Sequence, residues 1–164
     1  MRFRPPRRLT RPMHALAISA LLAVSAGAHA GTASLQQIVH ARQEHFHMLG
    51  RTAKSLRDQI VRSHPDWTVV SDDAHRLQQL AAQLPSWFPA GSGQGHGVKT
   101  RARALIWRDP RAFARAAHAL FSRARDLSRA AATHDRRTML LEFRALGHAC
   151  GSCHSRFRAH GSWW

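Results

Sequence analysis

The chain contains little cysteine, glycine and proline for its 164 residues. Two cysteines exclude a disulfide-rich scaffold, and 10 glycines with 7 prolines are too few for a collagenous or low-complexity chain. Aromatic residues make up only 7% of the sequence, but hydrophobic residues make up 44%, which argues against wholesale disorder. The length is sufficient for one domain.

Acidic residues are also scarce. The 9 Asp and Glu residues are outnumbered by 25 Lys and Arg residues, so the formal net charge is +16. A charge of this size admits nucleic acid, an anionic membrane or an acidic protein as a partner. The 13 histidines are a high count and bring metal chemistry into consideration.

The first 30 residues have the composition of an export signal. Five arginines and no acidic residue precede an apolar stretch over 15–28, and Ala28-His29-Ala30 is a small-x-small cleavage sequence. The apolar run of about 14 residues is too short to span a bilayer comfortably. We therefore expect cleavage after Ala30, a mature domain over 31–164, a periplasmic location and no membrane insertion. Export argues against nucleic acid. The arginine surplus is then explained most simply as a solvated, arginine-rich surface, with an acidic redox protein as a partner that it admits.

Apolar residues in the remaining chain recur at spacings of three and four, which predicts amphipathic helices. No alternating strand pattern is present. The sequence therefore predicts an all-α fold, an antiparallel left-handed four-helix bundle. The predicted helices are one over about 33–62 with Thr32 as its N-cap, one from Ser71 to Pro85, one that starts at Asp109-Pro110 and one that starts at Asp135, with a long loop over 85–99.

The last predicted helix contains Cys150-Gly-Ser-Cys153-His154. This C-x-x-C-H pattern is the signature of covalent haem c attachment. On a helix the three side chains share one face, so both thiols can add to the vinyl groups of one porphyrin while His154 binds the iron as axial ligand. A thioredoxin-like motif needs a βαβ setting, a zinc site needs further ligands, and a disulfide between helical positions i and i+3 has poor geometry.

A C-x-x-C-H motif in the last of four helices resembles the cytochrome c′ family, the class II c-type cytochromes. The resemblance extends over nearly all of the mature chain and implies a homodimer through the first two helices. It also implies that Arg42 and Gln43 hydrogen-bond the haem propionates. Arg101 and Arg103 are expected at the other propionate side, and Arg158, one turn after His154, beside the axial imidazole. The matching segments are Arg42-Gln43, Leu84-Pro85 with Trp87, Thr100-Arg101-Ala102-Arg103, Ile106-Trp107 and the stretch from Cys150 to Arg158.

The residue four positions after the first-helix arginine lies over the distal face of the haem in this family. Here that residue is Phe46. The apolar stripe of the helix contains Phe46 and, one turn earlier, the position of Arg42, so both residues lie on the seam that faces the core. A phenyl ring has no lone pair to give to iron. We therefore expect a five-coordinate haem with an apolar distal pocket that binds diatomic gases such as NO and CO and passes electrons.

Two other functions are compatible with the sequence. The first is a six-coordinate, low-spin electron-transfer cytochrome, which needs His45 or a rearranged Met48 as sixth ligand. The second is a haem enzyme such as a peroxidase, which needs a distal acid–base residue, a position that only His45 can fill. We expect no enzymatic activity.

Overall fold

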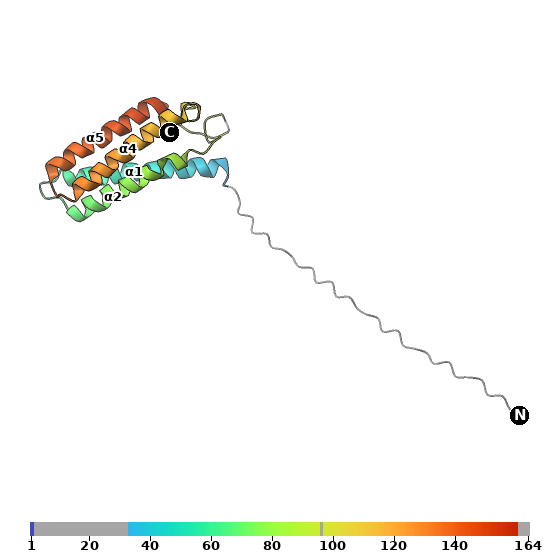
Figure 1. Ribbon diagram of the computed structural model, residues 1–164, viewed down its shortest axis with the longest axis horizontal. Coiled ribbons are helices and arrows are strands. Elements are labelled where there is room, and N and C mark those ends of the chain that lie inside the picture. Colours follow the sequence, from blue (N-terminus) through green and yellow to red (C-terminus); the bar gives the residue numbers. More distant parts are fainter. Residues whose placement is uncertain (2–32, 96, 161–164) are drawn as a thin grey trace. The chain divides into compact units, whose positions relative to one another are not determined.

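The fold is a bundle of four long antiparallel helices. The computed structural model describes Met1 and residues 33–95 and 97–160, so the predicted signal peptide, apart from Met1, lies outside the described residues. Figure 1 shows the long helices side by side, which confirms the predicted all-α bundle. Within the described ranges there is no β-strand, and none of the helices is long and apolar enough to cross a membrane. The long helices are α1 (Leu35–Ile60), α2 (Trp67–Gln83), α4 (Pro110–Ala131) and α5 (Arg136–Phe157).

The first two helices begin at other caps than the sequence predicted. Helix α1 is capped by Ser34 instead of Thr32, because Ser34 and Gln37 form a reciprocal capping box. Helix α2 begins at Trp67 instead of Ser71, because the side chain of Asp66 accepts hydrogen bonds from the first free backbone N–H groups.

The predicted starts of the last two long helices are confirmed. The side chain of Asp109 accepts a hydrogen bond from the N–H of Ala112 at the start of α4. Asp135 caps α5 in the same way. Asp109 also forms an ion pair with Arg156 near the end of α5 (Nη2 to Oδ2, 3.2 Å), so it joins the two helices at this end of the bundle.

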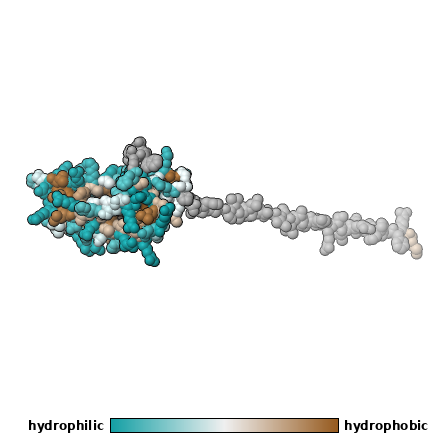
Figure 2. Space-filling view, turned by 90° about the horizontal axis from the view of Figure 1, so that it is seen from above, coloured by the Kyte–Doolittle hydropathy of each residue, from teal (hydrophilic) through white to brown (hydrophobic). Residues whose placement is uncertain are grey.

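The core lies where the apolar stripes of the helices meet. Helix α2 packs closely on α1 and α4, and α4 on α5, whereas α1 touches α5 at few positions. On the face shown in Figure 2, hydrophilic residues predominate and apolar ones form small separate patches. Fully buried side chains of the core are Leu56, Ile60, Val70, Leu77, Leu84, Leu127 and Met139.

The connection between α2 and α4 has more structure than the predicted loop. It contains a 3-10 turn, η1 (Leu84–Trp87), and a one-turn helix, α3 (Leu105–Arg108). In Figure 1 this connection lies at the end of the bundle where α5 finishes. The C-x-x-C-H residues near the end of α5 therefore lie at the same end of the bundle as this connection.

A buried arginine of α1 holds the connection in place. Arg42 is only 3% exposed. Its guanidinium group donates to the hydroxyl and carbonyl oxygens of Ser92 (3.0 Å each) and to the hydroxyl of Thr100 (2.8 Å). The ring of Phe88 lies 4.7 Å from the guanidinium carbon. The prediction that Arg42 belongs to the buried seam is confirmed.

Replacing Arg42 by Met leaves the buried oxygens of Ser92 and Thr100 without a donor. We expect the free energy of unfolding of the haem-loaded protein to fall by about 2–4 kcal/mol, measured by urea denaturation, with faster amide hydrogen exchange at Ala102. As a control, Gln43→Ala removes one exposed hydrogen bond and should cost less than about 0.5 kcal/mol. Equal losses in the two variants contradict the role assigned to Arg42.

Candidate haem site

The last two turns of α5 bring the side chains of the C-x-x-C-H sequence together. Cys150, Cys153 and His154 lie within the helix, which continues to Phe157. Both thiols are free and half-buried. Burial raises the pKa of both, and the neighbouring Cys150 raises the pKa of Cys153 further. Both thiols are therefore protonated at neutral pH, unlike the activated thiolate of a thioredoxin-like motif.

His154 lies at the exposed side of this helix end. Protein atoms that partly desolvate its ring lower the pKa of His154, and the positive charges of Arg158 and Arg101 lower it further. The neutral imidazole is therefore favoured. This is the form of histidine that has a free lone pair for a metal ion.

A short extended segment before α3 holds the end of α5. Ala102 and Arg158 form an isolated antiparallel β-bridge. The N–H of Arg103 donates to the carbonyl of Phe157 (2.9 Å), and the N–H of Ala159 donates to the carbonyl of Arg101 (2.8 Å). These bonds fix where the helix that bears Cys150, Cys153 and His154 ends.

Two arginines of this segment also bind the end of α5 through their side chains. Arg101 donates from Nε and Nη2 to the carbonyl of Ala159 (3.0 and 2.9 Å). Arg103 donates from Nη1 to the carbonyls of Ser155 and Arg156 (3.3 and 3.2 Å). The last carbonyls of a helix have no partner within it, so a cation there satisfies them.

Arg101 and Arg158 place two positive charges close together. Burial lowers the pKa of Arg158, and the charge of Arg101 lowers it further. Neither guanidinium group forms a salt bridge with any of the residues that the structure describes. An anionic group beside them relieves this repulsion, and a haem propionate has that charge.

The arginine–glutamine pair of α1 binds the connection between α2 and α4. Three N–H donations from Arg42 go to Ser92 and Thr100, out of the five N–H groups that a guanidinium has. Gln43 Nε2 donates to the carbonyl of Lys99 (3.3 Å). Both residues therefore lie at the end of the bundle that also holds the end of α5.

Phe46 belongs to a row of aromatic rings that crosses the bundle from α1 to α5. Its ring meets Trp87 edge-on at 5.2 Å between centroids and Phe88 at 6.0 Å. Phe88 contacts Phe113 of α4 at 4.9 Å, and Phe113 contacts Phe157 of α5 at 5.3 Å. The neighbours of Phe46 in this row are apolar rings. None of them has a lone pair suited to iron.

The other candidates for a sixth ligand on α1 lie in different environments. The ring of His45 stacks on Trp87 at 4.7 Å, and its Nδ1 is buried without a hydrogen-bond partner. The sulfur of Met48 accepts a hydrogen bond from Nη2 of Arg76 on α2 (3.4 Å). Met48 therefore packs toward α2.

Sequence reasoning assigned no role to three residues that shape this end of the bundle, although Thr100 falls in a segment that matches the family. Ser92 and Thr100 accept the hydrogen bonds of Arg42, and Phe88 links Phe46 to α4. The adjacent aromatic pair Trp87-Phe88 inside a region of turns is the signal that could have pointed to Phe88. No local pattern marks the two hydroxyl residues.

The donor set fits a covalently attached haem. It supplies two protonated, half-buried thiols and an imidazole that favours its neutral form, all on the last turns of one helix. In the described ranges, no group of three or more His, Cys, Asp or Glu side chains is placed to hold a metal ion by itself. A porphyrin brings its own four nitrogen ligands, so it needs only an axial residue from the chain.

Known proteins that are similar to this chain are cytochromes. The family model of cytochrome c′ matches residues 37–158. Cytochrome c′ of Rhodospirillum rubrum is 36% identical over 90 residues, which cover 54% of this chain and 59% of that protein. Cytochrome c-554 of Cereibacter sphaeroides is 28% identical over 150 residues, 90% of this chain and 97% of that protein.

A similar solved structure is the nitric oxide complex of a variant of cytochrome c prime from Alcaligenes xylosoxidans. It is 23% identical, covers 79% of this chain and 100% of its own, and superposes with a TM-score of 0.71. That likeness establishes the fold. Because the family model matches well over half of the sequence, the chain belongs to the cytochrome c′ family and binds one covalently attached haem c.

Proposed function

We propose that this chain is an exported, periplasmic haem protein that binds diatomic gases such as NO and CO and also passes electrons. The observation that carries the proposal is the surroundings of Phe46, whose ring contacts other aromatic rings. A ferrous haem iron with an open coordination position binds neutral diatomic ligands. The Alcaligenes protein of the same fold is a nitric oxide complex, which supports this choice of ligand.

The residues of α5 have separate roles in this proposal. Cys150 and Cys153 form the two thioether bonds, and His154 is the axial ligand. The neutral form of His154, favoured by its surroundings, keeps the lone pair available. The strap formed by 101–103 holds the helix end, so that the imidazole and the thiols keep one orientation.

We propose that the propionates of the haem lie among the basic residues at this end of the bundle. Arg101 and Arg158 have like charges in proximity, which an anion offsets. Arg42, Gln43 and Arg103 border the same end, and each retains N–H groups beyond those used for the carbonyls and hydroxyls described above. Arginine suits this role because it pairs with carboxylates through two parallel hydrogen bonds.

In this proposal, Phe46 determines which ligands bind, because its side chain has neither a lone pair for iron nor a hydrogen-bond donor. It offers no lone pair to the iron, so the distal position stays open, and it offers no hydrogen-bond donor to a bound ligand. NO and CO need no such donor, whereas dioxygen gains from one. The distal residue therefore favours NO and CO over dioxygen. A peroxidase needs an acid–base residue at that position, and the candidate for this role, His45, stacks on Trp87.

The spin state of the purified protein tests the proposal. We expect a broad, high-spin absorption spectrum that changes when CO is added to the protein after chemical reduction. A sharp low-spin α-band without CO binding supports the alternative, an electron-transfer cytochrome with six-coordinate iron. His45→Gln then identifies the ligand: a low-spin spectrum that becomes high-spin in this variant assigns His45, whose Nδ1 has no partner within the described structure.

Replacement of Phe46 tests directly whether this position of α1 faces the haem iron. Phe46→Met supplies a thioether at the position nearest to the predicted distal face, so we expect the iron to shift toward six-coordinate, low-spin character. Electron paramagnetic resonance of the ferric protein measures the change. Phe46→Leu is the matched control, because it alters the size of the side chain without adding a lone pair. A Met variant that stays as high-spin as the Leu variant places residue 46 away from the iron.

Attachment is tested by removing the thiols one at a time. Cys150→Ser and Cys153→Ser should each retain the pigment through the remaining thioether bond, and the double variant should release it into acidified acetone. Denaturing electrophoresis with haem staining measures what stays bound. Pigment retained by the double variant contradicts the assignment of both attachment residues.

A further inference from the structure

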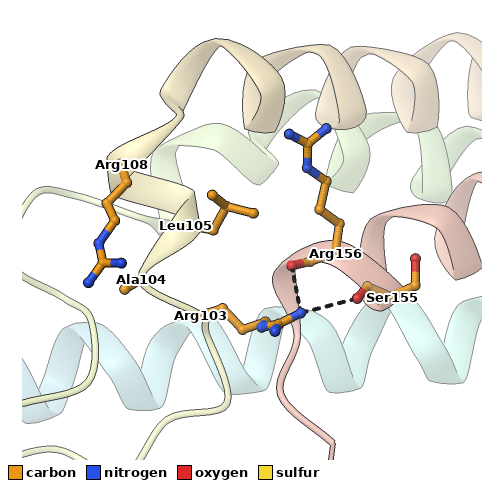
Figure 3. A pocket seen from close by; sticks show the side chains of 6 residues that line it. All are labelled: Arg103, Ala104, Leu105, Arg108, Ser155 and Arg156. Atoms are coloured by element: carbon orange, nitrogen blue, oxygen red, sulfur yellow. Dashed lines mark hydrogen bonds between the residues drawn. The ribbon is translucent and has the colours of Figure 1, made fainter.

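Four arginines surround two adjoining hollows next to the haem-attachment turns. The first hollow, of about 610 Å³, is lined by Arg103, Arg108 and Arg156. In Figure 3, Arg103 reaches the end of α5, while Arg108 and Arg156 extend on two sides of Leu105. The second hollow, of about 340 Å³, lies between α4 and α5 and adds Arg115. Among the residues that the structure describes, no acidic side chain lines either hollow.

Most of this charge is not neutralised within the described part of the chain. Arg156 pairs with Asp109, and Arg103 donates to carbonyl oxygens, which carry no net charge. Arg108 and Arg115 take part in no side-chain hydrogen bond or ion pair with any residue that the structure describes. Within the described residues, four positive charges therefore face one negative charge, and Arg108 and Arg115 have no partner among these residues.

The second hollow also leads to the attachment site. Cys153 lines it together with Arg156, which lines both hollows. Its other lining residues are mostly alanines of α4 and α5, together with Ser152 and Phe157. A partner seated over the arginines therefore lies directly against a residue that the proposed function bonds to the haem.

We propose that this arginine-rimmed surface, formed by Arg103, Arg108, Arg115 and Arg156, is the docking site of an acidic electron-donor protein. The inference rests on the proposed function, because a gas ligand of ferrous iron requires that the iron be reduced first. The donor loses one electron and the ferric iron gains it, and no bond of this chain is made or broken. Charge complementarity steers such partners and raises their association rate.

The shape of the surface favours a protein over a membrane. Helices that lie on lipid present protruding Trp, Phe or Leu side chains beneath their cationic residues. Here the arginines border concave hollows, and the apolar residues between them are mainly alanines. Acidic side chains of a protein can enter such hollows, whereas the plane of a bilayer cannot.

The experiment measures reduction of the ferric haem-loaded protein by reduced flavodoxin, an acidic one-electron donor used as the probe. The variant R108Q/R115Q/R156Q removes three charges of the surface. The matched control R57Q/R129Q/R137Q removes three exposed charges at the opposite end of the bundle. The cationic reductant hexaammineruthenium(II) and the reduction potential of each variant serve as further readouts.

We expect the bimolecular rate with flavodoxin to fall by about tenfold or more in R108Q/R115Q/R156Q at low ionic strength. The salt dependence of the rate should weaken at the same time, because screening acts on the charges that were removed. The control variant should stay within about threefold of the unmodified protein. Hexaammineruthenium(II) should react no more slowly with the surface variant. Removal of positive charges near the haem lowers its reduction potential, so the measured potentials give the driving force for which the flavodoxin rates are corrected.

Three results overturn the proposal. Equal losses in the surface and control variants mean that net charge alone governs the rate. An unchanged rate in the surface variant means that docking occurs elsewhere. Binding of the unmodified protein to phosphatidylglycerol vesicles that is lost in the surface variant, with an unchanged flavodoxin rate, assigns the surface to a lipid membrane.

Failure of the proposed function is seen separately. CO is added to protein reduced chemically with dithionite, which needs no docking. Protein that binds no CO but is still reduced through the arginine surface refutes gas binding and leaves the docking site standing. Protein that binds CO but is reduced equally well without the arginines refutes the docking site alone.

Discussion

The structure depends on keeping the last two turns of α5 helical up to Phe157. Cys150, Cys153 and His154 share one face only while the backbone between them is helical. Helix ends fray because their last carbonyls have no partner within the helix. In this chain the last carbonyls of α5 receive donors from Arg103 of the 101–103 strap, through its backbone N–H and its guanidinium group. Just beyond the helix, the guanidinium group of Arg101 donates to the carbonyl of Ala159, and the N–H of Ala159 donates to the carbonyl of Arg101. The attachment site is therefore stabilised by a segment about 50 residues away in sequence.

The strap is in turn held from the other side of the bundle. Arg42 of α1 binds Ser92 and Thr100, and the Thr100 hydroxyl also accepts a hydrogen bond from the N–H of Ala102. Burying the charge of Arg42 is costly unless its guanidinium group forms hydrogen bonds. The positions of Ser92 and Thr100 relative to α1 are therefore restricted to those that allow these bonds. This contact network links the helix that bears the proposed distal residue to the helix that bears the proposed axial ligand, although α1 and α5 touch directly at few positions.

The sequence predicted the features that depend on local spacing. The common face of the C-x-x-C-H residues, the caps at Asp109 and Asp135 and the buried position of Arg42 all follow from helical periodicity or from one side chain near its own backbone. The predicted start of α2 was wrong. In the sequence, Ser71-Asp72-Asp73 and Asp66 are equally good candidates for a helix start, and only the observed hydrogen bonds to Asp66 distinguish them. The partners of Arg42 lie 50 and 58 residues away, so no local pattern reveals them.

The concentration of arginine at the end of α5 follows from the chemistry of that end. The C-terminus of a helix carries partial negative charge, so cations there are stabilised instead of merely repelling one another. Arginine serves better than lysine because its planar group can place two donors on one carbonyl, as Arg101 does on Ala159, and still retain others. A strongly basic chain can therefore gather arginines at this end at low cost to its folding. The same placement that closes the helix leaves a positive surface beside Cys153, so the structural role and the proposed docking role arise from one arrangement of charge.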